Sequence, residues 1–126
     1  NPELTVVALR FSNVMEPHDY AEFPSFQDDA RLRAWNAWGY IDARDGAQAV
    51  RKALEFDQVG YDVFIIANAD TCMTRPSAEL AAEVFPDVLW TRQVEGTGTL
   101  LSIDKARRLL GYEPQQSWRD AFTVAT

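Results

Sequence analysis

Two short phrases contain the residues of this sequence whose types and spacing could do chemistry. The first, LRFSNV at residues 9–14, places Arg10, Ser12 and Asn13 at the end of an apolar, β-branched run. The second, YIDARD at residues 40–45, places two aspartates and an arginine where an apolar segment meets a helical pattern. In open α/β sheets ligands collect at the carboxyl ends of the strands, so both phrases are candidate binding positions.

The side chains of the first phrase have a structural as well as a functional interpretation. The Asn13 amide can donate to and accept from a ligand, or it can close the strand as an Asx turn. An arginine is costly to bury alone within an apolar run. Arg10 is therefore expected to form a salt bridge, for example to Asp42 or Asp45, or to contact a ligand.

Other reactive residue types occur without the spacing that their chemistry needs. His18 is the only histidine and Cys72 the only cysteine, and no CxxC or HxxxH pair exists, so we expect no metal site. Cys72 has no second histidine to serve as its base and is interpreted as a small structural residue. The pair Gly96 and Gly98 by itself says nothing about phosphate binding, and no GxGxxG follows the first apolar run.

Charge and length exclude further classes. The 126 residues include 12 basic and 19 acidic side chains, a net charge of −7. Such a chain repels the phosphate backbone of nucleic acids and anionic membrane surfaces, and no apolar run reaches the ~20 residues of a membrane-spanning helix. A single cysteine is typical of a reducing compartment, and no signal peptide opens the chain, so we expect a cytoplasmic location.

The pattern of apolar residues predicts an α/β fold with two parallel core strands, and these strands would position the two phrases. Continuous apolar runs at residues 5–11 and 62–67 are typical of strands covered on both faces, and a helix over residues 45–56 crosses between them. Asp42 or Asp45 is the expected N-cap of this helix. Short strands are predicted at residues 38–41 and 88–92, and residues 17–33 are interpreted mostly as loop. Three further helices are predicted: one from Thr74 or Ser77 to residue 85, one over residues 103–110 with Ser102 as N-cap and Gly111 as a stop, and one over residues 118–123.

Five phrases in this order resemble the C-terminal half of the extended short-chain dehydrogenase/reductase family, the NAD-dependent epimerases and dehydratases. ALRFSNV with the following Glu16 and Pro17 resembles "LRxxNVxGP", and WGYIDARD at residues 38–45 resembles "FVHVDDVA". VFIIANA at residues 63–69 resembles "VFNIA", and SAEL at residues 77–80 resembles "SxxEL". SIDKARRLLGYEP at residues 102–114 resembles "SKARRLLGWxP".

The resemblance implies the C-terminal part of a Rossmann-type enzyme that uses NAD or NADP. In that family a glycine-rich loop holds the cofactor and a Tyr-x-x-x-Lys pair transfers the proton; neither occurs here, so no catalytic residue is expected in this chain. We therefore interpret residues 1–126 as a single fragment, inactive alone, whose cofactor-binding part lies upstream. By the same resemblance Ser12 and Val14 contact the cofactor, and Asn13 contacts the substrate.

The sequence departs from the family where nucleotide sugars are held. Trp38 and Val94 stand where family members carry arginines that clamp a diphosphate. Arg33 or Arg92 are candidates to replace them. Trp38, with its aromatic neighbours, has two interpretations that remain open: it lines a more apolar substrate pocket, or it belongs to the core.

The expected partner is a small-molecule substrate, a sugar or a similar hydroxy or keto compound. Two alternatives remain: a degenerate domain that binds or scaffolds without turnover, and a reductase of non-sugar carbonyls. The strand over residues 5–11 is expected to have an adhesive edge, which makes a homodimer possible.

Overall fold

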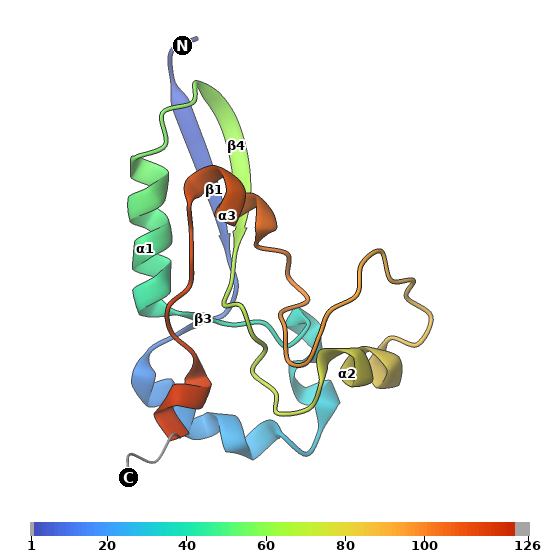
Figure 1. Cartoon of the computed structure of the whole chain (residues 1–126). Coiled ribbons are helices and arrows are strands. Elements are labelled where there is room, and N and C mark those ends of the chain that lie inside the picture. The colour runs from blue at the N-terminus through green and yellow to red at the C-terminus, as the bar shows by residue number, and fades with distance from the viewer. Residues whose placement is uncertain (1, 123–126) are drawn as a thin grey trace.

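The main sheet of the molecule consists of two parallel strands, β1 (Thr5–Phe11) and β4 (Gly60–Ile66), as Figure 1 shows. This computed structural model describes residues 2–122. The strands pair from Thr5 opposite Gly60 to Phe11 opposite Ile66. Helix α1 (Ala43–Leu54) lies between them in the chain, as a parallel crossover requires. The predicted α/β class, the two parallel strands and the crossover helix are confirmed.

A second, very short parallel sheet joins β2 (Val14–Met15) to β3 (Ile41–Asp42) and leads directly into α1. The predicted strand at residues 38–41 is wrong except for its last residue. The φ angles of Ala37 and Trp38 are 53° and 59°, so the backbone turns through the left-handed region there and cannot be extended. Asp42 caps α1, as predicted, because its carboxylate accepts the N–H of Arg44 at 2.9 Å.

The prediction of loop over residues 17–33 is wrong. The chain there forms two 3₁₀ helices, η1 (Pro17–Phe26) and η2 (Ala30–Asn36). The buried side chains of η1, Tyr20, Phe23 and Phe26, recur every third residue. That spacing matches the three residues per turn of a 3₁₀ helix and places all three rings on one side.

The remaining elements are α2 (Ser77–Val84), α3 (Asp104–Leu110) and η3 (Trp118–Phe122). Gly111 ends α3 with a φ of 73°, a left-handed stop that suits glycine, as predicted. Ser102 is not the N-cap: Ile103 occupies that position without a side-chain bond. Residues 88–92 form no strand and instead run as an irregular segment after α2. The predicted end of the last helix at residue 123 lies outside the described residues.

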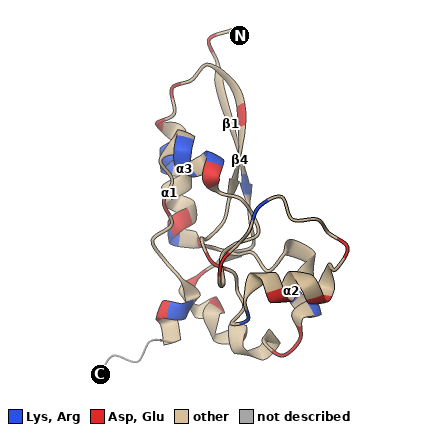
Figure 2. Cartoon of the chain, turned by 45° about the vertical axis from the view of Figure 1, so that its right-hand side comes forward, with Lys and Arg blue, Asp and Glu red and all other residues tan. Residues whose placement is uncertain are grey.

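Two hydrophobic clusters hold these elements together. One lies between η1, η2, α2 and η3 and includes Phe23, Trp38 and Trp118. The other lies beneath the sheet, where Phe64 and Ile66 of β4 pack with α1 and α3. Figure 2 shows the strands mostly tan, whereas α1 and α3 carry both blue and red segments. Within residues 2–122 no helix is both long and apolar enough to cross a membrane.

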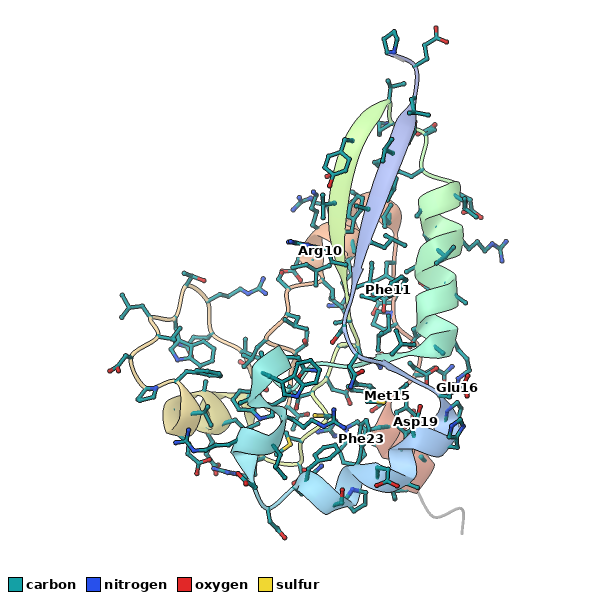
Figure 3. The ribbon with its side chains drawn as sticks, turned by 180° about the vertical axis from the view of Figure 1, so that it is seen from behind. Arg10, Phe11, Met15, Glu16, Asp19 and Phe23 are labelled. Atoms are coloured by element: carbon teal, nitrogen blue, oxygen red, sulfur yellow. The ribbon has the colours of Figure 1, made fainter. Side chains whose placement is uncertain are left out.

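The helices cover only one face of the main sheet, so the prediction that both faces are buried is wrong. On the other face Val6, Tyr61 and Ile65 are 41%, 69% and 36% exposed. Arg10 points to this open face, whereas Phe11 points toward α1 (Figure 3). Arg10 is consequently exposed and needs no buried partner; Asp42 pairs with Arg44 instead.

Candidate functional site

The carboxyl ends of β1 and β4 lie side by side, because the two strands are parallel and stop at paired residues. Ser12 extends the ladder by one step: its N–H donates to the carbonyl of Ile66 at 3.0 Å. The carbonyl of Asn13 accepts the N–H of Ile41 at 2.9 Å, which ties the exit of β1 to β3. The two phrases singled out in the sequence therefore meet at one edge of the sheet, where ligands collect in open α/β folds.

Two polar side chains at this edge are left without partners inside the described part of the chain. The Ser12 hydroxyl oxygen is buried and has no hydrogen bond there. The half-buried Asn13 amide also makes no hydrogen bond within residues 2–122. A buried hydroxyl without a partner costs about 1–3 kcal/mol, so such a group calls for an explanation. Val14, the third predicted residue of this phrase, is 51% exposed.

A cavity of about 550 Å³ opens between α2, the segment that follows it, and residues 99–102. Its volume lies within the range of about 300–1,000 Å³ typical of small-molecule sites. The lining is mostly apolar, with Arg92 as its charged member; Arg92 also pairs with Asp104 of α3. The apolar residues on the α2 side are Phe85, Val88, Leu89 and Trp90.

The packing of Gly39 against Leu101 lies between the cavity and the Ser12 hydroxyl. Ala37 and Leu100 line the cavity. Gly39 and Leu101, which follow them along the chain, pack next to Ser12: a Cβ on Gly39 would lie 2.4 Å from Leu101 Cδ1 and 2.9 Å from Ser12 Oγ. Ser12 is not among the residues that line the cavity, so Arg92 and Ser12 do not share one pocket.

Two predicted substrate contacts occupy interior or stacked positions. Trp38 is 0% exposed, and its indole N–H donates to the carbonyl of Ala30 at 2.7 Å. Its ring lies 5.7 Å from that of Phe85, so Trp38 forms part of the core, one of the two interpretations left open by the sequence. The Arg33 guanidinium lies 4.6 Å from the centre of the Phe26 ring, an arrangement typical of a cation–π contact.

The carboxylate of Asp42 is the centre of a buried polar cluster that the sequence did not predict. It accepts the Tyr20 hydroxyl at 2.5 Å and the Arg44 guanidinium at 2.9 Å. Burial acts to raise the pKa of Asp42, but the bonds from Arg44 and Tyr20 outweigh it and hold that pKa below its ordinary value. Burial and the neighbouring Asp42 charge raise the pKa of Tyr20, so Tyr20 stays protonated and cannot act as a base.

A second cluster fastens the C-terminal segment to the strand ends. Tyr40 donates to Asp70 at 2.7 Å, and Ser117 and Arg119 donate to the other Asp70 oxygen at 2.5 Å each. Asn68, at the exit of β4, accepts the N–H of Asp42 at 2.9 Å and donates to the carbonyl of Gln116 at 2.6 Å. Asn68 lies two residues after the end of β4, just as Asn13 lies two residues after the end of β1, and this shared position could have identified Asn68 from the sequence. Nothing in the sequence pointed to Asp70.

Asp45 also binds the C-terminal segment, at Gln115 and Gln116. Its two carboxylate oxygens accept the N–H groups of Gln115 and Gln116 at 2.8 and 2.9 Å. Burial raises the pKa of Asp45 despite these two bonds. Together with Asp42 and Asp70, Asp45 links chain segments, which explains these carboxylates without acid–base catalysis.

The remaining reactive residues are placed as follows. The Cys72 thiol is buried, and burial raises its pKa to about 11. His18 is exposed beside Glu16 and Asp19, each 3.4 Å away. Among the residues that the structure describes, no group of three histidine, cysteine, aspartate or glutamate side chains could hold a metal ion.

Comparison with known proteins adds no relative: no family model, no curated protein and no solved structure matches this chain.

Proposed function

We propose that this chain forms the substrate-side portion of an NAD(P)-dependent epimerase/dehydratase-type oxidoreductase that acts on a sugar or a similar hydroxy or keto compound. The observation that carries the proposal is the edge where β1 and β4 end, because neither the Ser12 hydroxyl nor the Asn13 amide has a hydrogen-bond partner there within residues 2–122. Five phrases that resemble this family, in the family's order, support the same assignment.

The roles of the residues follow from their chemistry. An amide has both a donor and an acceptor, so Asn13 can hold a hydroxyl or carbonyl oxygen of a substrate in a fixed orientation. The Ser12 hydroxyl is desolvated but buried beside Gly39, so a cofactor atom would reach it only after this packing opens. Val14, two residues later in the chain, offers exposed apolar contact. A nicotinamide cofactor would supply the hydride. The glycine-rich loop and the Tyr-x-x-x-Lys pair are absent from the 126 residues, so the chain alone is expected to bind but not to turn over.

The cavity favours one alternative, a reductase of less polar carbonyl compounds. Its lining is largely apolar, and Arg92, its charged member, is already paired with Asp104. Family members that hold a diphosphate carry arginines where this chain has Trp38 and Val94. A ketone with an apolar body would fit such a lining better than a charged nucleotide sugar.

Thermal unfolding with added ligands tests both versions. The 126-residue protein would be heated with NAD, NADP, UDP- and dTDP-sugars, and simple cyclic or aryl ketones in turn. A bound ligand at about 100 times its Kd adds about 2.7 kcal/mol of stability, a shift that is easily measured. We expect the shift to be lost in Asn13→Ala and reduced in Arg92→Ala, and to persist in the matched control Arg108→Ala, an exposed arginine of α3 away from the cavity lining.

The pattern of responses separates the alternatives. A shift with nucleotide sugars supports an epimerase or dehydratase, and a shift with ketones alone supports the carbonyl reductase. No shift with any cofactor or substrate, or a shift that Asn13→Ala leaves intact, would refute the assignment of this edge as a substrate site.

A further inference from the structure

Two sides of the cavity beside α2 are tied firmly to the rest of the chain. On the side of α2, the N–H of Phe85 donates to the carbonyl of Ala81 at 2.8 Å. The Phe85 ring also lies 5.7 Å from the ring of the buried Trp38. On the other side, the N–H of Thr99 donates to the carbonyl of Ala69 at 2.8 Å. Backbone bonds and core packing therefore fix the shape of both sides.

The third side of the cavity, residues 89–94, is attached only near its two ends. Before it, the N–H of Val88 donates to the Phe85 carbonyl at 3.2 Å. After it, the N–H of Gly98 donates to the Glu95 carbonyl at 3.0 Å. In the described part of the chain, no main-chain group between these two turns makes a hydrogen bond. Figure 1 shows the segment as a wide loop beyond α2.

An ion pair holds the middle of this segment. The Arg92 guanidinium pairs with the carboxylate of Asp104, in the first turn of α3. Both side chains are about half exposed, at 57% and 50%, and an exposed pair of this kind is weak enough to break readily. Leu89 and Trp90 line the cavity and yet are 89% and 42% exposed, so a ligand that covers them would stabilise the closed segment.

We propose that the cavity takes an uncharged apolar ligand, and that residues 89–94 are a flap which the ion pair between Arg92 and Asp104 holds closed over it. The ligand is uncharged because Asp104 already neutralises Arg92, the charged side chain of the lining. Gly96, with a φ of 52°, provides the left-handed turn at which the flap joins the rest of the chain.

The position of the ligand rests on the proposed function in its apolar-carbonyl version, whereas the flap and its latch go beyond it. All sides of the cavity and both members of the ion pair belong to residues 2–122. The flap therefore works with residues of this chain and requires no other polypeptide.

A latch has a kinetic signature that an ordinary contact lacks. If the ion pair is present with and without ligand, it must break both when a ligand enters and when it leaves. A weaker latch should then raise the association and dissociation rates by the same factor and leave Kd unchanged. A side chain that only contacts the bound ligand would instead change the dissociation rate and with it Kd.

The probe is N-phenyl-1-naphthylamine, an uncharged aromatic dye whose fluorescence rises in apolar surroundings, and stopped-flow fluorescence would give both of its rates. Asp104→Asn removes the charge of the latch and leaves Arg92 in the lining. We expect both rates to rise about twofold to fivefold, the range of an exposed ion pair, with Kd unchanged. The matched control Glu55→Gln removes the exposed ion pair of α1 with Arg51, outside the cavity, and should leave both rates as they are.

Two further measurements place the dye and the latch. Ala81→Leu adds a larger side chain to the α2 side of the cavity, and we expect it to weaken dye binding at least about tenfold, with its unfolding midpoint as a check of the fold. High salt screens an exposed ion pair. It should therefore raise both rates of the unaltered protein toward those of Asp104→Asn measured in the same salt.

Three results would overturn the proposal. One is a dye that does not bind, or that Ala81→Leu does not weaken, because the cavity is then not its site. Another is Asp104→Asn with the same two rates as Glu55→Gln. The third is a rise in the dissociation rate alone, which would make the ion pair a contact of the bound state and not a latch.

The flap and the proposed function fail in different ways. If the dye shows the kinetics of a latch but neither cofactors nor ketones bind, the proposed function is wrong and the flap stands. If ketones raise the unfolding temperature but Asp104→Asn leaves both dye rates unchanged, the flap is wrong and the proposed function stands.

Discussion

Replacing Tyr20 by phenylalanine removes one hydroxyl from the interior and leaves its ring in place. That hydroxyl donates to the buried Asp42 carboxylate at 2.5 Å. The ring keeps its edge-on contacts with Phe23 and Tyr40, whose centres lie 5.1 and 6.0 Å away. The substitution therefore isolates a single hydrogen bond between η1 and the start of α1.

The expected loss follows from the charge of the acceptor. A hydrogen bond to a charged group contributes about 1.5–3 kcal/mol, and Asp42 keeps its bonds from Arg44, which suggests a loss of about 2 kcal/mol. Unfolding entropy scales at about 2.1 cal/mol/K per residue, or about 0.26 kcal/mol/K for 126 residues. Tyr20→Phe should thus lower Tm by about 8 °C at neutral pH.

The loss should also depend on pH in one direction. The folded-state pKa of Asp42 is lowered, so the stability that it contributes is present above its unfolded pKa of about 3.9 and is lost as pH falls through the lower folded value. Without the Tyr20 bond the folded pKa rises toward normal. The difference in stability between the two proteins should be largest near neutral pH and shrink below about pH 4.

Urea unfolding across this pH range measures the effect, with Tyr61→Phe as the control because Tyr61 is 69% exposed. We expect the control to stay within about 0.5 kcal/mol of the unaltered protein. If Tyr20→Phe costs no more than Tyr61→Phe at neutral pH, or if its cost is the same at low pH, the charged acceptor is not what makes the bond strong.

Three further substitutions or treatments test other parts of the structure. Gly39→Ala should cost about 1–3 kcal/mol in urea unfolding, because the new Cβ would lie 2.4 Å from Leu101 Cδ1; an unchanged midpoint would show that this layer can move apart. The pKa of Asp45 is raised in the folded state, so the stability that Asp45 contributes to the fold is present below its unfolded pKa and is lost as pH rises through its folded pKa. Asp45→Asn should therefore remove this decline from a plot of stability against pH. Cys72 is buried with a pKa of about 11, so a thiol reagent should label it slowly in the native protein and rapidly in urea, and equal rates would contradict its burial.

The regular elements were largely predictable because their signals are local. The β-branched run at residues 5–11 became β1 with the expected bounds, and Gly111 ended α3 as a left-handed residue. The periodicity that predicted α1 placed its start two residues late; of the two expected caps, Asp42 and Asp45, Asp42 is the one that caps the helix. The 3₁₀ helices were missed because a period of three was interpreted as aperiodic loop.

The candidate site was predictable only in part. The order of the phrases brought Ser12 and Asn13 to the strand ends, but local sequence gave no sign that Trp38 is closed to solvent. Arg10 was expected to need a partner because a strand of this composition is usually covered on both faces. The helices of the described chain cover one face, so the same composition leaves Arg10 in solvent.

By itself, the sequence determined the acidic net charge, the two parallel strands with their crossover helix, and the absence of a Tyr-x-x-x-Lys pair and a glycine-rich loop. These properties depend on residue identity and on spacing within one segment. Only the tertiary structure decided that Asp42 meets Tyr20, that Asp70 fastens the C-terminal segment, and that Arg92 meets Asp104 beside a cavity. Each of these depends on contacts between residues far apart in the chain, which the folded packing alone brings together.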